Sequence, residues 1–308
     1  MNHPTTLLMI RPVSFGFNPQ TAGSNAFQNQ DAEQQLVQDK ALQEFDGFVA
    51  ILRANGVAVI VINDTPEPHT PDSIFPNNWV SFHSIGDILL YPMQAENRRL
   101  ERREDIINQL EDKFKVRHII DLSRFEAEGK FLEGTGSMVL NREDKLAYAC
   151  LSPRTDMEVL NVFCQQTGYK PIIFHAFDQN GQAIYHTNVM MCIADRYVVI
   201  CLASITDAKE REAVITSFFQ TGKDIFDITF DQMNHFAGNM LEVFDQAGDS
   251  LLVMSTSAYN SLDDRQIATL QQFSRIVSAP IPTIERNGGG SARCMMAEVR
   301  LSPLTKTK

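Results

Sequence analysis

The chain has 308 residues, of which 44% are hydrophobic, and a formal net charge of −11. This length suits two ordinary domains or one large domain, and the negative charge disfavours nucleic acid and anionic membranes as partners. No run approaches the ~18 apolar residues of a membrane span. Five cysteines, an odd number without a CxxC pair, indicate a reducing compartment, so we expect a cytoplasmic protein.

Helical and strand patterns alternate along the chain in a repeated order. The block 155–202 shows the unit most clearly: a helix ends at Gly168, an apolar strand ends at the turn 178–181, and a strand hairpin follows. The order is helix, strand, strand, strand. Helices are expected at 31–54, 98–114, 155–167, 207–221 and 261–274, and each precedes a strand, at 57–62, 116–122, 171–177, 225–230 and 276–284.

Five equivalent positions mark the start of the inner strand of each unit. They are Asn78, Ser137, Asn188, Asn239 and Cys294, spaced by 59, 51, 51 and 55 residues. A period of about 50 residues predicts units arranged radially. The last such strand, 295–301, has no strand and helix after it, and we expect 6–10 and 31–54 to supply them. The sequence therefore predicts one domain, residues 1–308, folded as a five-fold pseudo-symmetric α/β propeller closed by the two chain ends.

Cys294 is the residue best placed for chemistry. Three glycines, 288–290, precede it, and glycines belong where the backbone bends sharply or approaches a ligand. Arg293 makes the surroundings positive, which favours a reactive thiolate. We therefore expect Cys294 to be a nucleophile, whereas Cys150, Cys164, Cys192 and Cys201 are expected to pack in the core.

A thiolate nucleophile needs a partner for proton transfer. Among seven histidines only His186 stands at the head of a repeat strand, two residues before Asn188, so it is the candidate general acid and base. Glu133 precedes Gly134 and Gly136 and is expected to bind a cationic or N–H-rich group. The alternatives are a structural histidine and a solvated carboxylate.

These motifs, together with Leu-Ser-Pro-Arg-Thr at 151–155, resemble the pentein superfamily over about residues 5–301. That superfamily includes arginine deiminases, dimethylarginine dimethylaminohydrolases and amidinotransferases, and the chain is most similar to its citrulline-utilisation hydrolases. The resemblance implies a covalent cysteine mechanism without metal or cofactor. It also implies roles for particular residues: Cys294, His186 and Glu133 are catalytic, and Asn78, Asn188, Arg154 and Arg293 bind the substrate.

The chain departs from the guanidine-cleaving members of that superfamily at two positions. Asn78 and Asn188 stand where those enzymes commonly carry aspartate. A guanidinium has only N–H donors and is best met by carboxylates, whereas asparagine offers both an acceptor and a donor. A neutral ureido group matches that combination. Asparagine could also merely adjust a guanidine site, and this alternative stays open.

The sequence therefore predicts a cysteine hydrolase of a small ureido or guanidino amino acid, with cleavage of citrulline to ornithine, carbon dioxide and ammonia favoured. The alternatives are an arginine deiminase, a dimethylarginine-type amidinohydrolase and an amidinotransferase. A binding protein of the same fold is the non-enzymatic alternative, and the retained Cys294, His186 and Glu133 argue against it. We expect an amino-acid substrate, no nucleic acid or membrane partner, and a mobile lid at 15–27. The resemblance also allows a homodimer.

Overall fold

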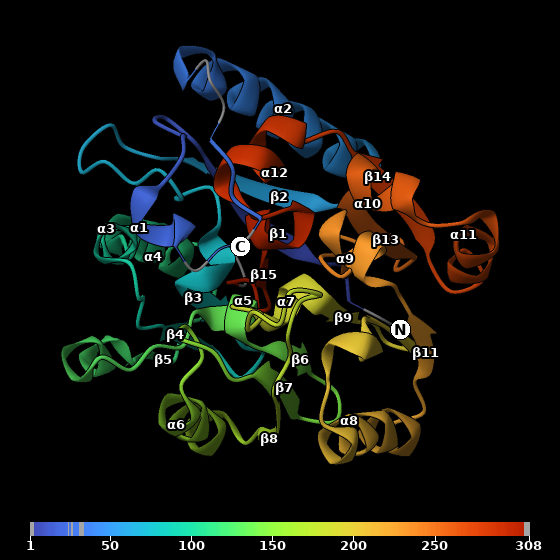
Figure 1. Ribbon diagram of the computed structural model, residues 1–308. Helices are drawn as coiled ribbons and strands as arrows, with labels where there is room; N and C mark the ends of the chain where they lie inside the picture. The colour runs from blue at the N-terminus through green and yellow to red at the C-terminus, as the bar shows by residue number, and fades with distance from the viewer. Residues whose placement is uncertain (1–2, 24, 26, 31–33, 305–308) are drawn as a thin grey trace.

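The computed structural model describes residues 3–23, 25, 27–30 and 34–304. These residues form five three-stranded sheets with helices packed around them (Figure 1). The sheets are β3 (Val80–Phe82), β4 (Asp87–Leu90) and β5 (His118–Asp121); β6 (Val139–Asn141), β7 (Leu146–Cys150) and β8 (Lys170–Phe174); β9 (Met191–Ile193), β10 (Tyr197–Ile200) and β11 (Asp224–Asp227); β12 (Leu241–Phe244), β13 (Ser250–Ser255) and β14 (Arg275–Ala279); β15 (Ala297–Val299), β1 (Thr6–Arg11) and β2 (Ala58–Asn63).

All five sheets share one topology. The first strand pairs antiparallel with the middle strand, and the middle strand pairs parallel with the third. A parallel partner requires a crossover connection, and a helix usually supplies it. The crossovers run through α2 (Gln34–Ala54), α4 (Glu104–Glu111), α6 (Met157–Thr167), α8 (Ala208–Gln220) and α11 (Asp264–Leu270). The repeated unit predicted from the sequence is confirmed.

The two ends of the chain share one sheet, as the sequence predicted. β1 lies between β15 and β2, with Thr6 opposite Val299 on one side and Ala58 on the other. In Figure 1 the blue N-terminal strands and the red C-terminal strand therefore lie side by side. The N–H of Thr5 also donates to the Phe244 carbonyl of the neighbouring sheet.

Short helical turns occur where the sequence predicted the beginnings of inner strands. They are η1 (Pro76–Asn78), α5 (Gly134–Ser137), α7 (Thr187–Met190) and η4 (Ala292–Met295). These turns pack closely on one another. As a result, a Cβ added at Gly136 would collide with Asn78 Nδ2 and His186 Nδ1. The inner strands are consequently short and begin two or three residues later than expected.

Three further predictions of element bounds were wrong. The helix expected at 98–114 is divided into α3 (Glu96–Arg99) and α4. The one expected at 261–274 is the shorter α11, and α10 (Thr256–Ser261) precedes it. Asp263 caps α11 with a capping box, which sets a new helix start. The strand expected at 276–284 ends at Ala279, and Pro282 begins α12 (Pro282–Gly288). The remaining short helices are α1 (Pro19–Ala22), α9 (Phe230–Asn234), η2 (Ser123–Glu128) and η3 (Leu202–Ser204).

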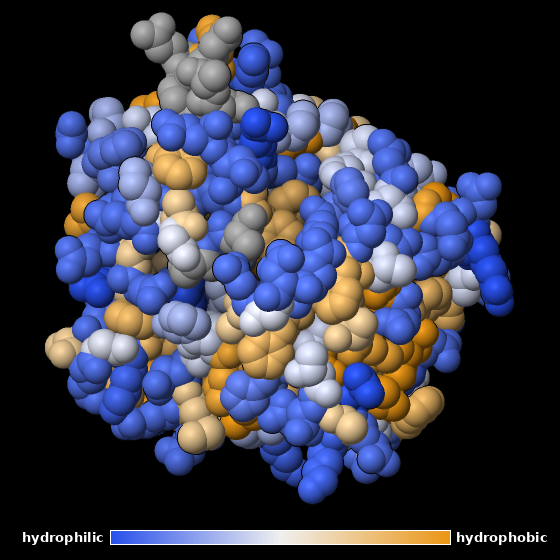
Figure 2. Space-filling view, viewed as in Figure 1, coloured by the Kyte–Doolittle hydropathy of each residue, from blue (hydrophilic) through white to orange (hydrophobic). Residues whose placement is uncertain are grey.

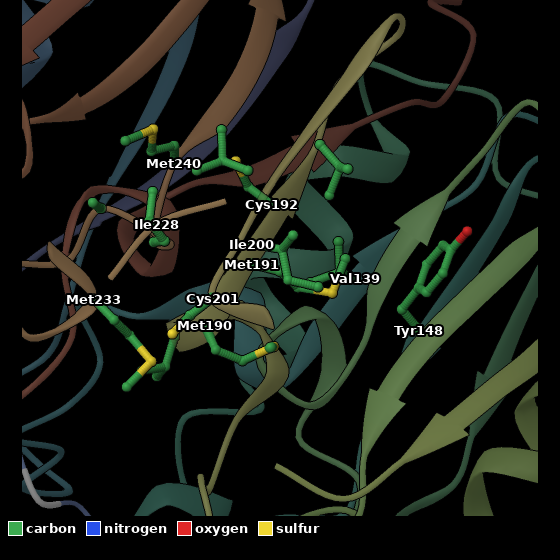
Figure 3. Close-up of a cluster of buried hydrophobic side chains, with 14 of the residues drawn as sticks. Val139, Tyr148, Met190, Met191, Cys192, Ile200, Cys201, Ile228, Met233 and Met240 are labelled. Atoms are coloured by element: carbon green, nitrogen blue, oxygen red, sulfur yellow. The ribbon is translucent and has the colours of Figure 1, made fainter. Parts of the chain in front are cut away.

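The hydrophobic core lies between the sheets and the surrounding helices. Figure 3 shows part of it, where Met190, Met191 and Cys192 pack beside Ile200 and Cys201. As expected, the four cysteines other than Cys294 are buried in hydrophobic clusters, at positions 150, 164, 192 and 201. Burial raises the pKa of these four thiols to about 11 or 12, which keeps them protonated and unreactive near neutral pH.

The surface is mainly hydrophilic on the face shown in Figure 2, with scattered apolar side chains. Single exposed apolar residues such as Phe219 and Met157 are ordinary on a folded protein. Among the described residues, no helix has both the length and the apolar character that a bilayer crossing demands.

The close packing of the turns predicts opposite effects for two glycine substitutions. A Cβ at Gly238 would collide with the backbone of Val189 and Met190, whereas one at Gly47 in α2 meets no atom within 4 Å. Gly238→Ala should lower the free energy of unfolding by about 1–3 kcal/mol through overpacking. Gly47→Ala should raise it by about 0.4–1 kcal/mol, because alanine restricts the unfolded chain. Urea unfolding measures both, and a harmless Gly238→Ala would contradict the packing described.

Candidate active site

The turns before the inner strands bring distant residues to one small cavity, which we call the catalytic cavity. Asn78, Arg154, His186 and Cys294 line it, together with Gly288–Gly290. Its volume is about 20 Å³, which leaves room for about one water molecule. The cavity is therefore too small for an amino-acid substrate in this conformation.

Cys294 lies in η4 with its sulfur between two amides. Its Sγ is 3.3 Å from Nδ2 of Asn188 and 3.3 Å from Nδ2 of Asn239. The N–H of Arg293 donates to Asn239 Oδ1 at 3.1 Å, and Asn239 Nδ2 also donates to the Asn188 carbonyl at 2.9 Å. These contacts fix the Asn239 amide with its N–H groups towards the sulfur. Two donors suit a thiolate, which can only accept hydrogen bonds.

Glu133 and His186 form a buried pair, of which His186 lines the same cavity as this cysteine. Glu133 Oε2 lies 2.8 Å from His186 Nε2 and 3.5 Å from Arg154 Nη1, while its Oε1 accepts from the N–H of Gln94. Burial opposes a charge on Glu133, but Arg154 and the hydrogen bond from His186 outweigh it and hold the pKa of Glu133 well below its usual range. The carboxylate is therefore ionised.

Burial is the main cause that lowers the pKa of His186 to about 4, and Glu133 offsets it only partly. The imidazole is consequently neutral near pH 7. Because the Glu133 carboxylate can only accept, the ring proton belongs on Nε2, and Nδ1 is left as an acceptor. A neutral ring held in one tautomer by a carboxylate is suited to take up a proton at Nδ1.

Arg98 is a cavity residue that the sequence did not reveal. Its guanidinium makes two hydrogen bonds to Glu101, at 2.8 and 2.9 Å, and donates from Nη1 to Asn78 Oδ1 at 2.9 Å. The side chain is buried, although the arginine-rich stretch 98–103 has the pattern of a solvated helix face. Since Arg98 occupies Asn78 Oδ1, the amide presents Nδ2, which is buried without a hydrogen-bond partner.

Asp72 is the second cavity residue that sequence analysis missed. One of its oxygens, Oδ2, accepts from Asn18 Nδ2 at 2.7 Å and from Thr21 Oγ1 at 3.3 Å. The other oxygen, Oδ1, is buried without a partner. Asp72 thus supplies the cavity with a free acceptor, and nothing in its position within the repeat indicates this.

A segment around α1 covers the catalytic cavity. The Thr21 carbonyl accepts from Arg154 Nη2 at 3.0 Å, and Asn25 Nδ2 donates to the carbonyls of Gly288 and Gly289 at 3.4 and 3.3 Å. This is the segment 15–27 expected to act as a lid, of which Ser24 and Ala26 lie outside the described residues. Its mobility stays a prediction.

Two of the expected substrate-binding residues do not line the catalytic cavity. Asn188 donates to Cys294 Sγ, but its side chain lines a second cavity instead. Arg293 was placed wrongly: its guanidinium donates to the Met296 carbonyl at 2.7 Å and lies 3.8 Å from Glu298, in that second cavity. Neighbouring residues of the η4 turn point in different directions, so Arg293 cannot follow Cys294 into the site.

The remaining predicted residues meet as the sequence suggested. Cys294, His186, Asn78 and Arg154 line one cavity, and Glu133 contacts two of them. Within the part of the chain that the structure describes, no three His, Cys, Asp or Glu side chains are grouped so that they could hold a metal ion.

The family profile described as "N,N dimethylarginine dimethylhydrolase, eukaryotic" matches residues 11–301. The chain belongs to this family. The resemblance to the pentein superfamily of guanidino-modifying hydrolases and amidinotransferases is thereby confirmed. A search of the curated proteins found no match.

Solved structures share this fold. The cyanobacterial arginine dihydrolase ArgZ superposes with a TM-score of 0.76 at 15% identity, covering 98% of this chain and 41% of ArgZ. The chain thus spans about two fifths of full-length ArgZ, but it covers 98% of the N-terminal ArgZ domain, solved as a cysteine-to-serine variant bound to substrate. Dimethylarginine dimethylaminohydrolase from Pseudomonas aeruginosa, also a cysteine-to-serine variant and bound to citrulline, gives a TM-score of 0.66 at 13% identity, covering 96% and 99% of the two chains.

The lowered pKa of His186 predicts a pH-dependent contribution to stability. In the unfolded chain a histidine titrates near pH 6.5, so between about pH 6.5 and 4 the unfolded state binds a proton that folded His186 does not. This contribution is fully present above pH 6.5 and is lost as pH falls, by up to about 1.4 kcal/mol per pH unit.

His186→Asn should therefore weaken the fall in unfolding free energy between pH 7 and pH 5. Urea unfolding of both proteins at the two pH values provides the comparison. The unchanged His83, also buried with a lowered pKa, contributes equally to both. Identical slopes for the variant and the parent protein would contradict a neutral, buried His186.

Proposed function

We propose that the protein hydrolyses the ureido group of citrulline, or of a closely similar amino acid, through a covalent intermediate on Cys294. The observation that carries this proposal is the orientation of Asn78. Arg98 occupies its oxygen, so the cavity meets a buried N–H donor that has no partner. A ureido carbonyl can accept from that donor, whereas a guanidinium has no acceptor and would leave it unsatisfied.

The reaction itself supports the same choice. A developing oxyanion on the ureido carbon would be stabilised by the Asn78 N–H. Arg98 holds this amide in place without adding net charge, because Glu101 binds its guanidinium at 2.8 and 2.9 Å and Asp72 lies 3.7 Å away. The donor thus favours a substrate whose central carbon carries oxygen.

The proposed chemistry uses the neutral His186. Its Nδ1 takes the thiol proton as Cys294 Sγ attacks the ureido carbon, and Glu133 stabilises the imidazolium that forms. Collapse of the tetrahedral adduct breaks the bond to the substrate's side-chain nitrogen, which leaves as ornithine after taking the proton from His186. A carbamoyl thioester remains on Cys294.

Water completes the reaction. His186 accepts a proton from water as the oxygen attacks the thioester carbon, and the sulfur departs and is reprotonated. The released carbamic acid decomposes to carbon dioxide and ammonia. Asn188 and Asn239, which donate to Sγ, stabilise the sulfur each time it carries negative charge.

The amino-acid end of the substrate has two matching groups. Arg154 lines the cavity and is bonded to the covering segment through the Thr21 carbonyl. When that segment moves, the planar guanidinium of Arg154 is suited to hold the substrate carboxylate. The free oxygen of Asp72 is suited to the substrate's α-amino group.

One observation favours guanidine cleavage as the second candidate. The free Asp72 oxygen is a carboxylate within the cavity, and a guanidinium would bind it well. Arginine or a methylated arginine would then lose ammonia or an amine to give citrulline, and an amidinotransferase would pass the group to a second amine. Asp72 is bonded through Oδ2 to Asn18 and Thr21 of the covering segment, which makes recognition of the α-amino group the better account.

The covalent role predicts that Cys294→Ala abolishes turnover of citrulline. No other described group in the cavity is a thiol, so activity should fall below about a thousandth of the parent value. The fold should be retained, because alanine leaves the amides of Asn188 and Asn239 room for water. Ammonia release measures the activity and urea unfolding the stability. Activity surviving at a few per cent would contradict the covalent mechanism.

The orientation of Asn78 predicts a change of substrate preference. The parent protein should cleave citrulline with a higher kcat/KM than arginine. In Asn78→Asp one carboxylate oxygen still accepts from Arg98 and the other faces the substrate. The ratio of kcat/KM for arginine to kcat/KM for citrulline should therefore rise by about tenfold or more.

Asn161→Asp is the matched control, because Asn161 is exposed on α6 and the substitution adds the same charge away from the cavity lining. It should not move the ratio towards arginine. A parent protein that prefers arginine would refute the ureido assignment and leave the cysteine hydrolase intact.

A further inference from the structure

The structure contains a second and larger cavity, which we call the basal cavity. Residues of β6, β9, β12 and β15 line it, and its volume is about 380 Å³. That volume is within the range of small-molecule sites, whereas the catalytic cavity has about 20 Å³. Neither Cys294 nor His186 reaches the basal cavity. Of its lining residues, the chemistry proposed above uses Asn188 alone.

The basal cavity contains more positive than negative charge around Glu298. Arg142, Arg300 and Arg293 lie 3.1, 3.3 and 3.8 Å from the oxygens of this one carboxylate. Three guanidinium groups therefore share a single negative charge. Arg142 and Arg293 are 13% and 9% exposed at their side chains, so water screens their mutual repulsion only weakly.

Neighbouring groups respond to this excess charge. Burial and then the charges of Arg142 and Arg300 lower the pKa of Lys145. The pKa of His83 is lowered to about 3, first by burial and then by Arg142 and Lys145. His83 is therefore neutral and adds no charge of its own. Both groups line the basal cavity.

The other acids of the basal cavity do not balance the arginines. Glu242 accepts from the Ser250 hydroxyl and from the N–H of Asp195, both at 2.7 Å, and burial raises its pKa. Asp195 is exposed at the surface. Glu143 is exposed at the surface. The region between Arg142, Arg293 and Arg300 thus remains positive.

We propose that the basal cavity binds a small dianion, a phosphate group or a dicarboxylate, between Arg142, Arg293 and Arg300. Guanidinium groups bind either anion through paired N–H donors, and a dianion would neutralise the two positive charges that Glu298 leaves uncompensated. Leu140, Met191 and Met240 supply an apolar wall, which suits an organic molecule that carries the anionic group. Asn188 lines this cavity and also donates to Cys294 Sγ, so the dianion would bind one side chain away from the nucleophile.

Calorimetric titration with inorganic phosphate, and separately with succinate, tests the proposal at low ionic strength. The parent protein should bind at least one of them saturably, with one site per chain. Arg142→Gln and Arg300→Gln should each weaken that binding by about tenfold or more, the effect of losing a charge-assisted contact. Arg265→Gln, on the exposed surface of α11, removes the same charge elsewhere and should leave binding unchanged.

The variants are chosen so that the fold survives. Without Arg142, Glu298 keeps Arg293 and Arg300 as partners, and Arg300 is itself 46% exposed. Arg154→Gln distinguishes the two cavities, because it removes a cation from the catalytic cavity and should leave phosphate and succinate binding unchanged. Binding by neither anion, equal binding by the Arg142 and Arg300 variants and the parent, or binding lost only in Arg154→Gln would overturn the proposal.

Discussion

The close approach of the turns at the centre of the structure is the constraint on which the site depends. A side chain at Gly134 or Gly136 would collide with the turn that carries Asn77 and Asn78, and one at Gly136 also with His186. Only glycine lets these backbones come so near. The same approach places Asn78, His186 and Cys294 around one cavity although more than 200 residues separate them. Compact packing and the arrangement of reacting groups thus have one cause.

Buried charge then decides what each group can do. Glu133 stays ionised because Arg154 and His186 contact it, and the ionised carboxylate fixes the tautomer of a neutral His186. Arg98 acts similarly on Asn78, since it occupies the amide oxygen and turns the N–H groups towards the cavity. In both cases an arginine outside the reacting atoms sets the hydrogen-bonding role of a residue beside them. Charge placement, rather than the identity of the cavity residues alone, underlies the proposed choice of a neutral substrate group.

The sequence predicted the features that repeat. The spacing of Asn78, Ser137, Asn188, Asn239 and Cys294 gave the five units, and the shared sheet of β1 and β15 followed from the unmatched chain ends. Arg98 and Asp72 could not be predicted, because neither stands at a repeated position and each acts through a contact across the fold. Arg293 was misplaced because adjacency in sequence does not determine side-chain direction within a turn. The basal cavity likewise depends on side chains from several sheets.

The central claim is that Cys294 attacks a ureido carbon, and mass spectrometry of the quenched reaction tests it most directly. The protein is mixed with citrulline, and the reaction is stopped with acid within the first turnovers. The protein is then digested, and the mass of the peptide that contains Cys294 is measured. The account predicts a carbamoyl group on Cys294, formed from citrulline and absent from the His186→Asn protein. An adduct formed only with arginine, or a carbamoyl group on a residue other than Cys294, would contradict it.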